Sequence, residues 1–187
     1  MINAWRGVLA FAKYADDVRA GDACAKYWHS VADTQIRNTG AATNRERFLS
    51  GGGAPAILPV EMRPNENCVQ CGWLRFTREL FASSGDVRCA HEMERTLYNH
   101  ILGSAASDGT DFAYYQGNVG RKVFRMNGLY QCCRYRGFAE IERVCLKMRG
   151  LDILKLPRIQ FLKICGLELE CIVACMIQRL FLWFNAG

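Results

Sequence analysis

Cysteine is the residue type in this sequence with the greatest chemical potential. The chain has 187 residues and ten cysteines, a share too high to ignore and too low for a small disulfide-rich scaffold. Two groups of them have spacings that indicate a shared role. One lies within Asn65-Glu66-Asn67-Cys68-Val69-Gln70-Cys71, and the other is the adjacent pair Cys132-Cys133.

The adjacent cysteines point to an external binding partner. Neighbouring cysteines seldom bridge each other, because the ring that they would close is strained. Disulfides are also rare in the reducing compartment that we expect for this chain. Zinc is the natural candidate, since it takes four ligands from thiolates, imidazoles and carboxylates. The two groups offer Glu66, Cys68, Cys71, Cys132 and Cys133.

A purely structural zinc site is one alternative for these ligands. It would use Cys68, Cys71, Cys132 and Cys133, because C-x-x-C is a common zinc-binding motif. Such a motif normally lies on a tight turn, whereas Cys68 and Cys71 stand at the beginning of a helical pattern. The other cysteines are predicted to be buried packing residues, since cysteine behaves as a small hydrophobe: Cys24, Cys89, Cys145, Cys165, Cys171 and Cys175.

Charge and hydropathy exclude several classes of partner. The net charge of +6 is spread along the chain without a basic cluster, so no nucleic-acid partner is expected. The N-terminus lacks the pattern of a signal peptide, which predicts a cytoplasmic protein. No apolar run reaches the length of a membrane span, because Gln178 and Arg179 interrupt the nearest one.

The elements that must position these residues are mostly helical. Apolar residues recur with helical spacing from Asp22 to Arg37 and from Cys68 to Phe81. Asp86 is a predicted N-cap for a further helix, which ends at Gly103. Because only four residues separate these last two helices, we expect them to form an αα-hairpin.

The remaining segments are less regular. A long loop from Asn38 to Asn65 contains Gly-rich and Pro-rich stretches, and a loop of that length is usually functional or mobile. Alternating apolar residues and glycines from Asp111 to Gln131 predict short strands. A helix is predicted from Phe138 to Met148. The fold class is therefore mainly α, with a few short β-strands.

Several of these motifs occur together in one known family. The helix Glu92-Met93-Glu94-Arg95-Thr96-Leu97-Tyr98-Asn99 is followed by Asp108-Gly109 and an aromatic segment, Phe112-Ala113-Tyr114-Tyr115. Glu66-Asn67-Cys68, Cys132-Cys133 and the segment from Thr39-Gly40 to Glu46-Arg47-Phe48 complete the set. With these elements in order, residues 20 to 140 resemble the catalytic domain of glycoside hydrolase family 127, the β-L-arabinofuranosidase-like family.

The resemblance implies a retaining glycosidase that acts on a carbohydrate substrate, a β-L-arabinofuranoside. It implies zinc ligands at Glu66, Cys68, Cys132 and Cys133, with Cys132 as the nucleophile and Glu46 as the general acid/base. Zinc would keep a thiol deprotonated at neutral pH. A glutamate can protonate the departing oxygen and then deprotonate the hydrolytic water.

Some candidate residues have a plain structural alternative. Glu46 could be a solvated loop carboxylate, and its neighbours Arg45 and Arg47 favour the ionised form, which is the wrong form for an acid catalyst. Aromatic residues could stack on a sugar or fill the core, and those concerned are Tyr114, Tyr115 and Tyr130. His91 and His100 share no ligand face, so we interpret them as structural or exposed.

The chain also departs from the family. The family's domain is a toroid of six helical hairpins that needs roughly twice this length, so we expect a partial (α/α) toroid. Residues 1–141 would form this partial catalytic domain, and 142–187 an unassigned apolar extension, interpreted as foreign to the family. The alternative function is a non-catalytic remnant that serves as an interaction module around a structural zinc site. Uncovered apolar helix faces predict self-association in either case.

Overall fold

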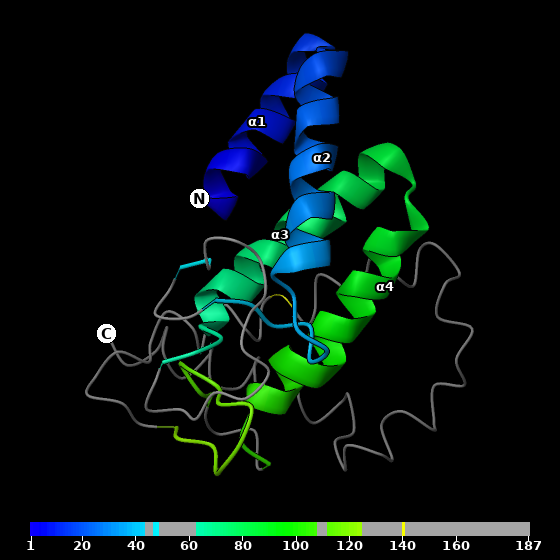
Figure 1. Cartoon of the computed structure of the whole chain (residues 1–187). Coiled ribbons are helices and arrows are strands. Elements are labelled where there is room, and N and C mark those ends of the chain that lie inside the picture. Colours follow the sequence, from blue (N-terminus) through cyan, green and yellow to red (C-terminus); the bar gives the residue numbers. More distant parts are fainter. Residues whose placement is uncertain (44–46, 49–62, 108–111, 125–139, 141–187) are drawn as a thin grey trace, which may run out of the picture. The chain divides into compact units, whose positions relative to one another are not determined.

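The computed structural model describes residues 1–43, 47–48, 63–107, 112–124 and 140. The chain divides into two units, Met1–Val144 and Cys145–Gly187, and the second lies outside the described residues. The described part of the first unit is mainly helical (Figure 1), as predicted. Its elements are α1 (Ile2–Ala15), α2 (Val18–Thr34), α3 (Asn67–Ser84), α4 (Val87–Arg95), the π-helix η2 (Thr96–Ile101) and the 3₁₀-helix η3 (Leu102–Ser104).

The predicted αα-hairpin is the pair α3 and α4. Gly85 ends α3 in the left-handed region, at φ 66°, and its N–H donates to the carbonyl of Phe81. The Asp86 side chain then caps α4 by accepting a hydrogen bond of 2.9 Å from the backbone N–H of Arg88. The turn residues thus end one helix and begin the next, which confirms the boundary predicted from sequence.

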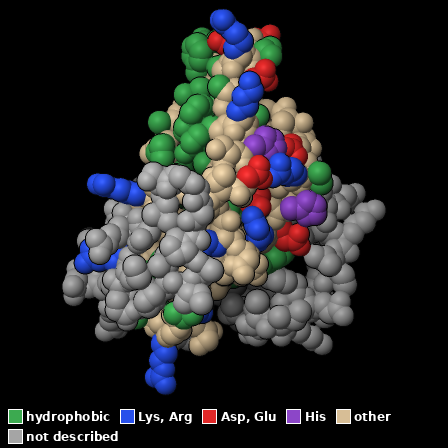
Figure 2. Space-filling view, viewed as in Figure 1, with side chains coloured by type: hydrophobic (Ala, Val, Ile, Leu, Met, Phe, Trp, Pro, Cys, Tyr) green, Lys and Arg blue, Asp and Glu red, His purple; other side chains and the backbone are tan. Residues whose placement is uncertain are grey.

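Helix α1 was not predicted, although the sequence carries a signal for it. Its buried residues Ile2, Leu9 and Ala12 recur with helical spacing, whereas Val8, Phe11 and Tyr14 on the other side are exposed. The helix packs on α2 and α3, and Figure 2 shows hydrophobic side chains gathered over it at the upper left.

The core between α1, α2 and α3 is aromatic. The rings of Trp28 and Trp73 stack with centroids 5.4 Å apart, and the indole N–H of Trp28 donates to the Thr77 hydroxyl at 2.9 Å. Cys24 and Cys89 are fully buried members of this core, which confirms their prediction as packing residues. The cysteines at 145, 165, 171 and 175 lie outside the described residues.

The segment predicted as strands is extended but forms no strand in its described part, 112–124. Its isolated antiparallel bridges include Glu66 with Tyr115 and Ala105 with Phe112. Each bridge joins the segment to a helix end, because Glu66 is the N-cap of α3 and Ala105 the C-cap of η3. A helix end offers only one or two extended residues for pairing, so the bridges do not lengthen into a ladder.

A loop from Gln35 to Thr43 packs against α3 and η2 through its own carbonyl groups. Gln70 donates to the carbonyl of Ala42 at 3.0 Å, and the Thr96 hydroxyl donates to that of Gly40 at 2.9 Å. Gly40 has φ +73°, and a Cβ built there would lie 2.5 Å from the Cα of Thr96. Only glycine allows the loop to approach η2 so closely.

Several predictions fall outside the described residues. They are the helix from Phe138 to Met148 except Glu140, most of the long loop, and the extension 142–187. The toroid and the domain boundary remain predictions. Among the described residues, no helix is long and apolar enough to cross a membrane.

Replacing Gly40 with alanine should destabilise the domain by about 3 kcal/mol or more, because the methyl group would overlap backbone atoms of η2. Two other glycines distinguish the cost of left-handed backbone strain from the cost of the steric overlap. Gly85→Ala has the same left-handed strain but open space, so it should cost about 1 kcal/mol. Gly21→Ala lies in a helix with open space and should stabilise by about 1 kcal/mol. Urea unfolding of the three variants checks this order; equal costs at positions 40 and 85 would show that Gly40 does not make this close contact.

Candidate functional site

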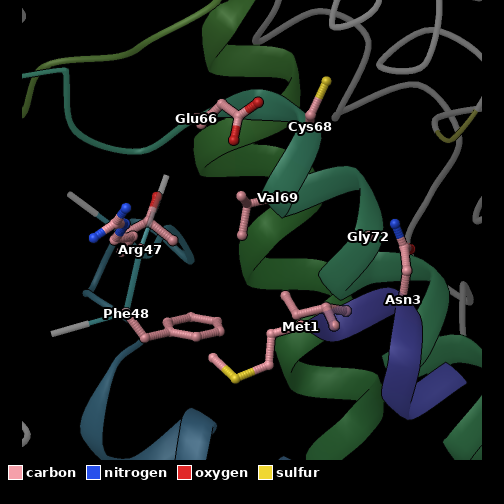
Figure 3. Close-up of a pocket in the computed structure, with 10 residues that line it drawn as sticks. Met1, Asn3, Arg47, Phe48, Glu66, Cys68, Val69 and Gly72 are labelled. Carbon is pink, nitrogen blue, oxygen red and sulfur yellow. The ribbon is translucent and has the colours of Figure 1, made fainter. Parts of the chain in front are cut away.

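Glu66 and Cys68 lie together at the start of α3, on the wall of a cavity of about 500 Å³. Glu66 is the N-cap of the helix and is only 7% exposed, and Cys68 is half-buried in the first turn. Figure 3 shows both side chains at one end of the cavity. A carboxylate and a thiol therefore lie at the same end of the cavity.

Tyr114 holds the Glu66 carboxylate in position. Its phenol O–H donates to the Oε1 atom of Glu66 at 3.1 Å, and the backbone N–H of Asn67 donates to the carbonyl of Tyr114 at 3.0 Å. The bridge between Glu66 and Tyr115 reinforces this attachment. Residues far apart in sequence therefore orient the carboxylate.

A group of buried polar side chains supports this end of the cavity from within the domain. We call it the buried polar layer, and it comprises Arg37, Asn65, Asn67, Gln70, Thr96, His100 and Ser104. Arg37 donates to the Asn65 side chain and, at 3.2 Å, to the carbonyl of Thr43. The Ser104 hydroxyl donates to the carbonyl of His100 at 2.7 Å. Together with the bond from the Thr96 hydroxyl to the carbonyl of Gly40, these bonds connect the loop from Gln35 to Thr43, the start of α3 and the η2–η3 region.

Two members of this layer have perturbed ionisation. Burial lowers the pKa of the Arg37 guanidinium. Burial and the charge of Arg37 lower the pKa of His100 to about 3, so His100 is neutral at physiological pH. Its Nε2 atom finds no hydrogen-bond partner among the described residues. His100 is therefore a structural residue, as predicted, and His91 is exposed on α4.

The other end of the cavity has a different character. It is lined by Ile2, Phe48, Val69 and Gly72, together with Met1. Figure 3 shows the Phe48 ring turned toward the cavity and the Met1 side chain beside it. Phe48 and Val69 also pack against the hydrophobic core, and this packing holds the apolar wall in place.

Of the predicted site residues, the structure brings Glu66 and Cys68 together. Glu46, Cys132 and Cys133 lie outside the described residues, and Tyr130 does too. Within the ranges that the structure describes, no three His, Cys, Asp or Glu side chains are grouped closely enough to hold a metal ion. The roles of the predicted residues therefore stay predictions.

Glu66 and Cys68, the proposed ligands that the structure describes, could supply two of the four ligands of a zinc site. A carboxylate and a thiol two residues apart are ligand types that zinc takes, and both residues line the same cavity. Cys71, the competing ligand, is 1% exposed and does not line the cavity. The burial of Cys71 therefore favours the pair Glu66 and Cys68 over the pair Cys68 and Cys71.

Two features of the site were missed in the sequence. The lining residues Ile2 and Asn3 come from α1, a helix that was not predicted. Phe48 stands two residues after Glu46 in the segment already singled out, and that spacing was the available signal. Tyr115 is 3% exposed and serves the bridge to Glu66, so it belongs to the core and not to the cavity wall.

Comparison with protein families shows which family the chain matches. The model of the family described as β-L-arabinofuranosidase, GH127 catalytic domain, matches residues 2–143. That range includes every described residue except Met1. No curated protein matches the chain.

The buried His100 should make stability depend on pH. In the unfolded chain histidine titrates near pH 6.5, whereas in the folded chain the pKa of His100 is about 3. Between these values the unfolded chain binds more protons, so the free energy of unfolding should fall as the pH falls, by up to about 1.4 kcal/mol per pH unit. His100→Gln should lose this slope in urea denaturation between pH 7.5 and 4.5. His91→Gln controls for loss of an exposed histidine, and parallel curves for wild type and His100→Gln would contradict the assignment.

Proposed function

Because this chain belongs to the β-L-arabinofuranosidase family of catalytic domains, glycoside hydrolase family 127, we propose that it hydrolyses β-L-arabinofuranosides with retention of configuration. Membership of a glycoside hydrolase family implies a carbohydrate substrate. The proposed nucleophile is Cys132 and the proposed acid/base is Glu46, while Glu66, Cys68, Cys132 and Cys133 would hold zinc.

The observation that carries this proposal is the placement of Glu66 and Cys68. These residues place a carboxylate and a thiol at a helix N-terminus, on the wall of a cavity of about 500 Å³. A purely structural metal site has no need of such a cavity. A structural site is closed on all sides, whereas a catalytic site faces a space that admits substrate. Zinc, when bound, would keep the cysteine ligands deprotonated at neutral pH.

The proposed chemistry needs two residues with different tasks. The sulfur of Cys132 forms a bond to the anomeric carbon as the bond from that carbon to the leaving oxygen breaks, and Glu46 gives its proton to that oxygen. Water then attacks the same carbon and passes a proton to the Glu46 carboxylate. The carbon–sulfur bond breaks, and its electron pair returns to the sulfur.

Residues that the structure does describe prepare the site for this reaction. The hydrogen bond from Tyr114 fixes the Glu66 carboxylate, and such a supporting bond orients a metal ligand before the metal arrives. The loop that leads to Glu46 is anchored at Gly40 and Ala42. Thr43 and Arg47, the described residues on either side of the segment 44–46, both line the cavity.

The direct test compares zinc content and release of arabinose from methyl β-L-arabinofuranoside. Cys68→Ala should lose zinc, and Cys71→Ala, one helical turn further on, is its matched control and should keep it. Cys132→Ser and Glu46→Gln should each lower kcat by about 100-fold or more.

Two outcomes would contradict the proposal. Stoichiometric zinc without turnover in the wild type would refute the hydrolase. Turnover that survives Cys132→Ser would refute the nucleophile. Circular dichroism of each variant identifies any loss that comes from unfolding.

A second candidate function, an interaction module, is favoured by the exposed face of α1. We call the exposed residues Val8, Phe11 and Tyr14 of α1 and Val18 at the start of α2 the apolar stripe. Figure 2 shows hydrophobic side chains gathered over α1. Phe11 is 56% and Tyr14 93% exposed, which leaves about 300 Å² of aromatic surface. The whole stripe has on the order of 500 Å², so two copies would bury about 1,000 Å², the lower limit for a specific dimer. The occupant that we propose is a second copy of this chain.

Light scattering over a range of protein concentrations tests this candidate. Phe11→Glu should convert a dimer into a monomer, because a buried interface does not accept an unpaired charge. Val87→Glu is the matched control, since Val87 is 63% exposed but lies on α4. A wild-type monomer at all concentrations, or a dimer that persists in Phe11→Glu, would refute the pairing.

A further inference from the structure

The cysteines Cys68 and Cys71 stand one helical turn apart, and the proposed hydrolysis uses only the first of them. Both residues are in the thiol form. We propose that they form a modification site for hydroperoxides, at which oxidation joins the two sulfurs in a disulfide within α3. This inference goes beyond the proposed function, and only its consequence for zinc rests on that function.

The backbone of α3 places the two residues at a distance that a disulfide can span. Cys68 and Cys71 both lie in this α-helix, Asn67–Ser84. In an α-helix, residues three apart have Cα atoms about 5 Å from each other and lie on neighbouring sides. Disulfides have Cα–Cα distances of roughly 4.4–6.8 Å. The bond can therefore form without unwinding α3.

The side chains must still move closer together, and the position of Cys68 in the first turn permits this. Cβ atoms three residues apart in a helix are about 5–6 Å from each other, whereas a disulfide needs about 3.5–4.5 Å. The backbone N–H groups of a first turn have no acceptor within the helix. A small shift of Cys68 toward Cys71 therefore breaks no helical hydrogen bond at its N–H.

The two thiols differ in their access to a reagent. Cys68 is half-buried and lines the cavity of about 500 Å³, and Figure 3 shows its side chain at one end. Cys71 is 1% exposed and does not line the cavity. A hydroperoxide that enters the cavity would therefore react with Cys68 first, and Cys71 would act as the resolving thiol. An accessible cysteine next to a second cysteine is the arrangement typical of redox sensors.

The thiols of the hydrophobic core are poorly suited to this reaction. Cys24 and Cys89 are fully buried there. Burial raises the pKa of the Cys24 thiol, and burial together with Asp86 and Glu92 raises the pKa of Cys89 to about 12. Because the thiolate is the reactive form, a thiol that stays protonated reacts slowly with an oxidant.

The proposed oxidation takes two steps. The sulfur of Cys68 attacks hydrogen peroxide, and a sulfur–oxygen bond forms as the oxygen–oxygen bond breaks, which leaves a sulfenic acid and one water. The sulfur of Cys71 then attacks the sulfur of Cys68. The sulfur–oxygen bond breaks as the disulfide forms, and the departing oxygen takes the Cys71 proton to leave as a second water. Overall, the two thiols lose two electrons and two protons, and the peroxide is reduced to water.

The disulfide would also change the proposed zinc site. Zinc binds cysteine as a thiolate, and a sulfur that is part of a disulfide cannot supply one. Because Cys68 is a proposed zinc ligand, peroxide should release zinc, and a reducing agent should allow zinc to bind again.

The experiment treats the full chain with hydrogen peroxide, with and without a chelator, and alkylates the remaining thiols. Mass spectrometry then follows the tryptic peptide that ends at Arg75, which contains Cys68 and Cys71 and no other cysteine. Cys71→Ala removes the resolving thiol. Cys89→Ala is the matched control, because it removes a thiol that is as deeply buried but belongs to the core.

The expected result is a reversible change that depends on Cys71. In the wild type and in Cys89→Ala, the peptide should lose two hydrogen atoms, resist alkylation and recover after dithiothreitol. In Cys71→Ala, Cys68 should proceed to the sulfinic acid, a gain of two oxygen atoms that dithiothreitol does not reverse. Zinc released from the wild type should bind again after reduction, whereas zinc released from Cys71→Ala should not.

The outcomes separate this inference from the proposed function. A reversible disulfide in a chain that binds no zinc when reduced would support the modification site and refute the zinc site. Bound zinc and turnover, with a peptide that only gains oxygen or that pairs Cys68 with a cysteine other than Cys71, would overturn the modification site and support the hydrolase. A peptide that peroxide leaves unchanged would overturn the modification site as well.

Discussion

The need to pair the backbone carbonyls of one buried loop organises the described part of this protein. In the loop from Gln35 to Thr43, the residues from Gly40 to Thr43 are buried, so their backbone polar groups need partners within the protein. Gln70, Thr96 and Arg37 donate to the carbonyls of Ala42, Gly40 and Thr43 respectively. These donors belong to α3, to η2 and to the loop itself, so the bonds tie the three parts to one another. The bond from Thr96 also requires the close approach of Gly40 to η2.

The hydrogen bonds of this loop also help to fix the geometry of the candidate site. Asn65, which is held by Arg37, precedes Glu66 in the chain, and the loop ends at Thr43 on the cavity wall. Tyr114 reaches Glu66 from the other side. The carboxylate is therefore fixed by one bond from a distant tyrosine and by a backbone that the buried polar layer holds in place. This rigidity suits a ligand that must be oriented before metal or substrate arrives.

Local signals predicted most of the helical fold. The capping residue Asp86 and the terminal Gly85 act within one or two residues, so the α3–α4 hairpin was visible in the sequence. Helix α1 was missed, although its buried residues Ile2, Leu9 and Ala12 recur with helical spacing. The extended segment 112–124 was predicted as strands, but its neighbours are helix ends and not strands, which pattern alone does not reveal.

The amino-acid sequence by itself determined which reactive groups are available. They are the two thiol clusters, Glu46 between its two arginines, and the helix start at Glu66. These follow from residue type and from spacing within a few positions. Only the tertiary structure decided that Cys68 faces a cavity while Cys71 is buried, that Tyr114 supports Glu66, and that Phe48 and α1 build an apolar wall. Those facts depend on contacts between residues separated by tens of positions, and such contacts are set by packing and by the pairing of buried polar groups.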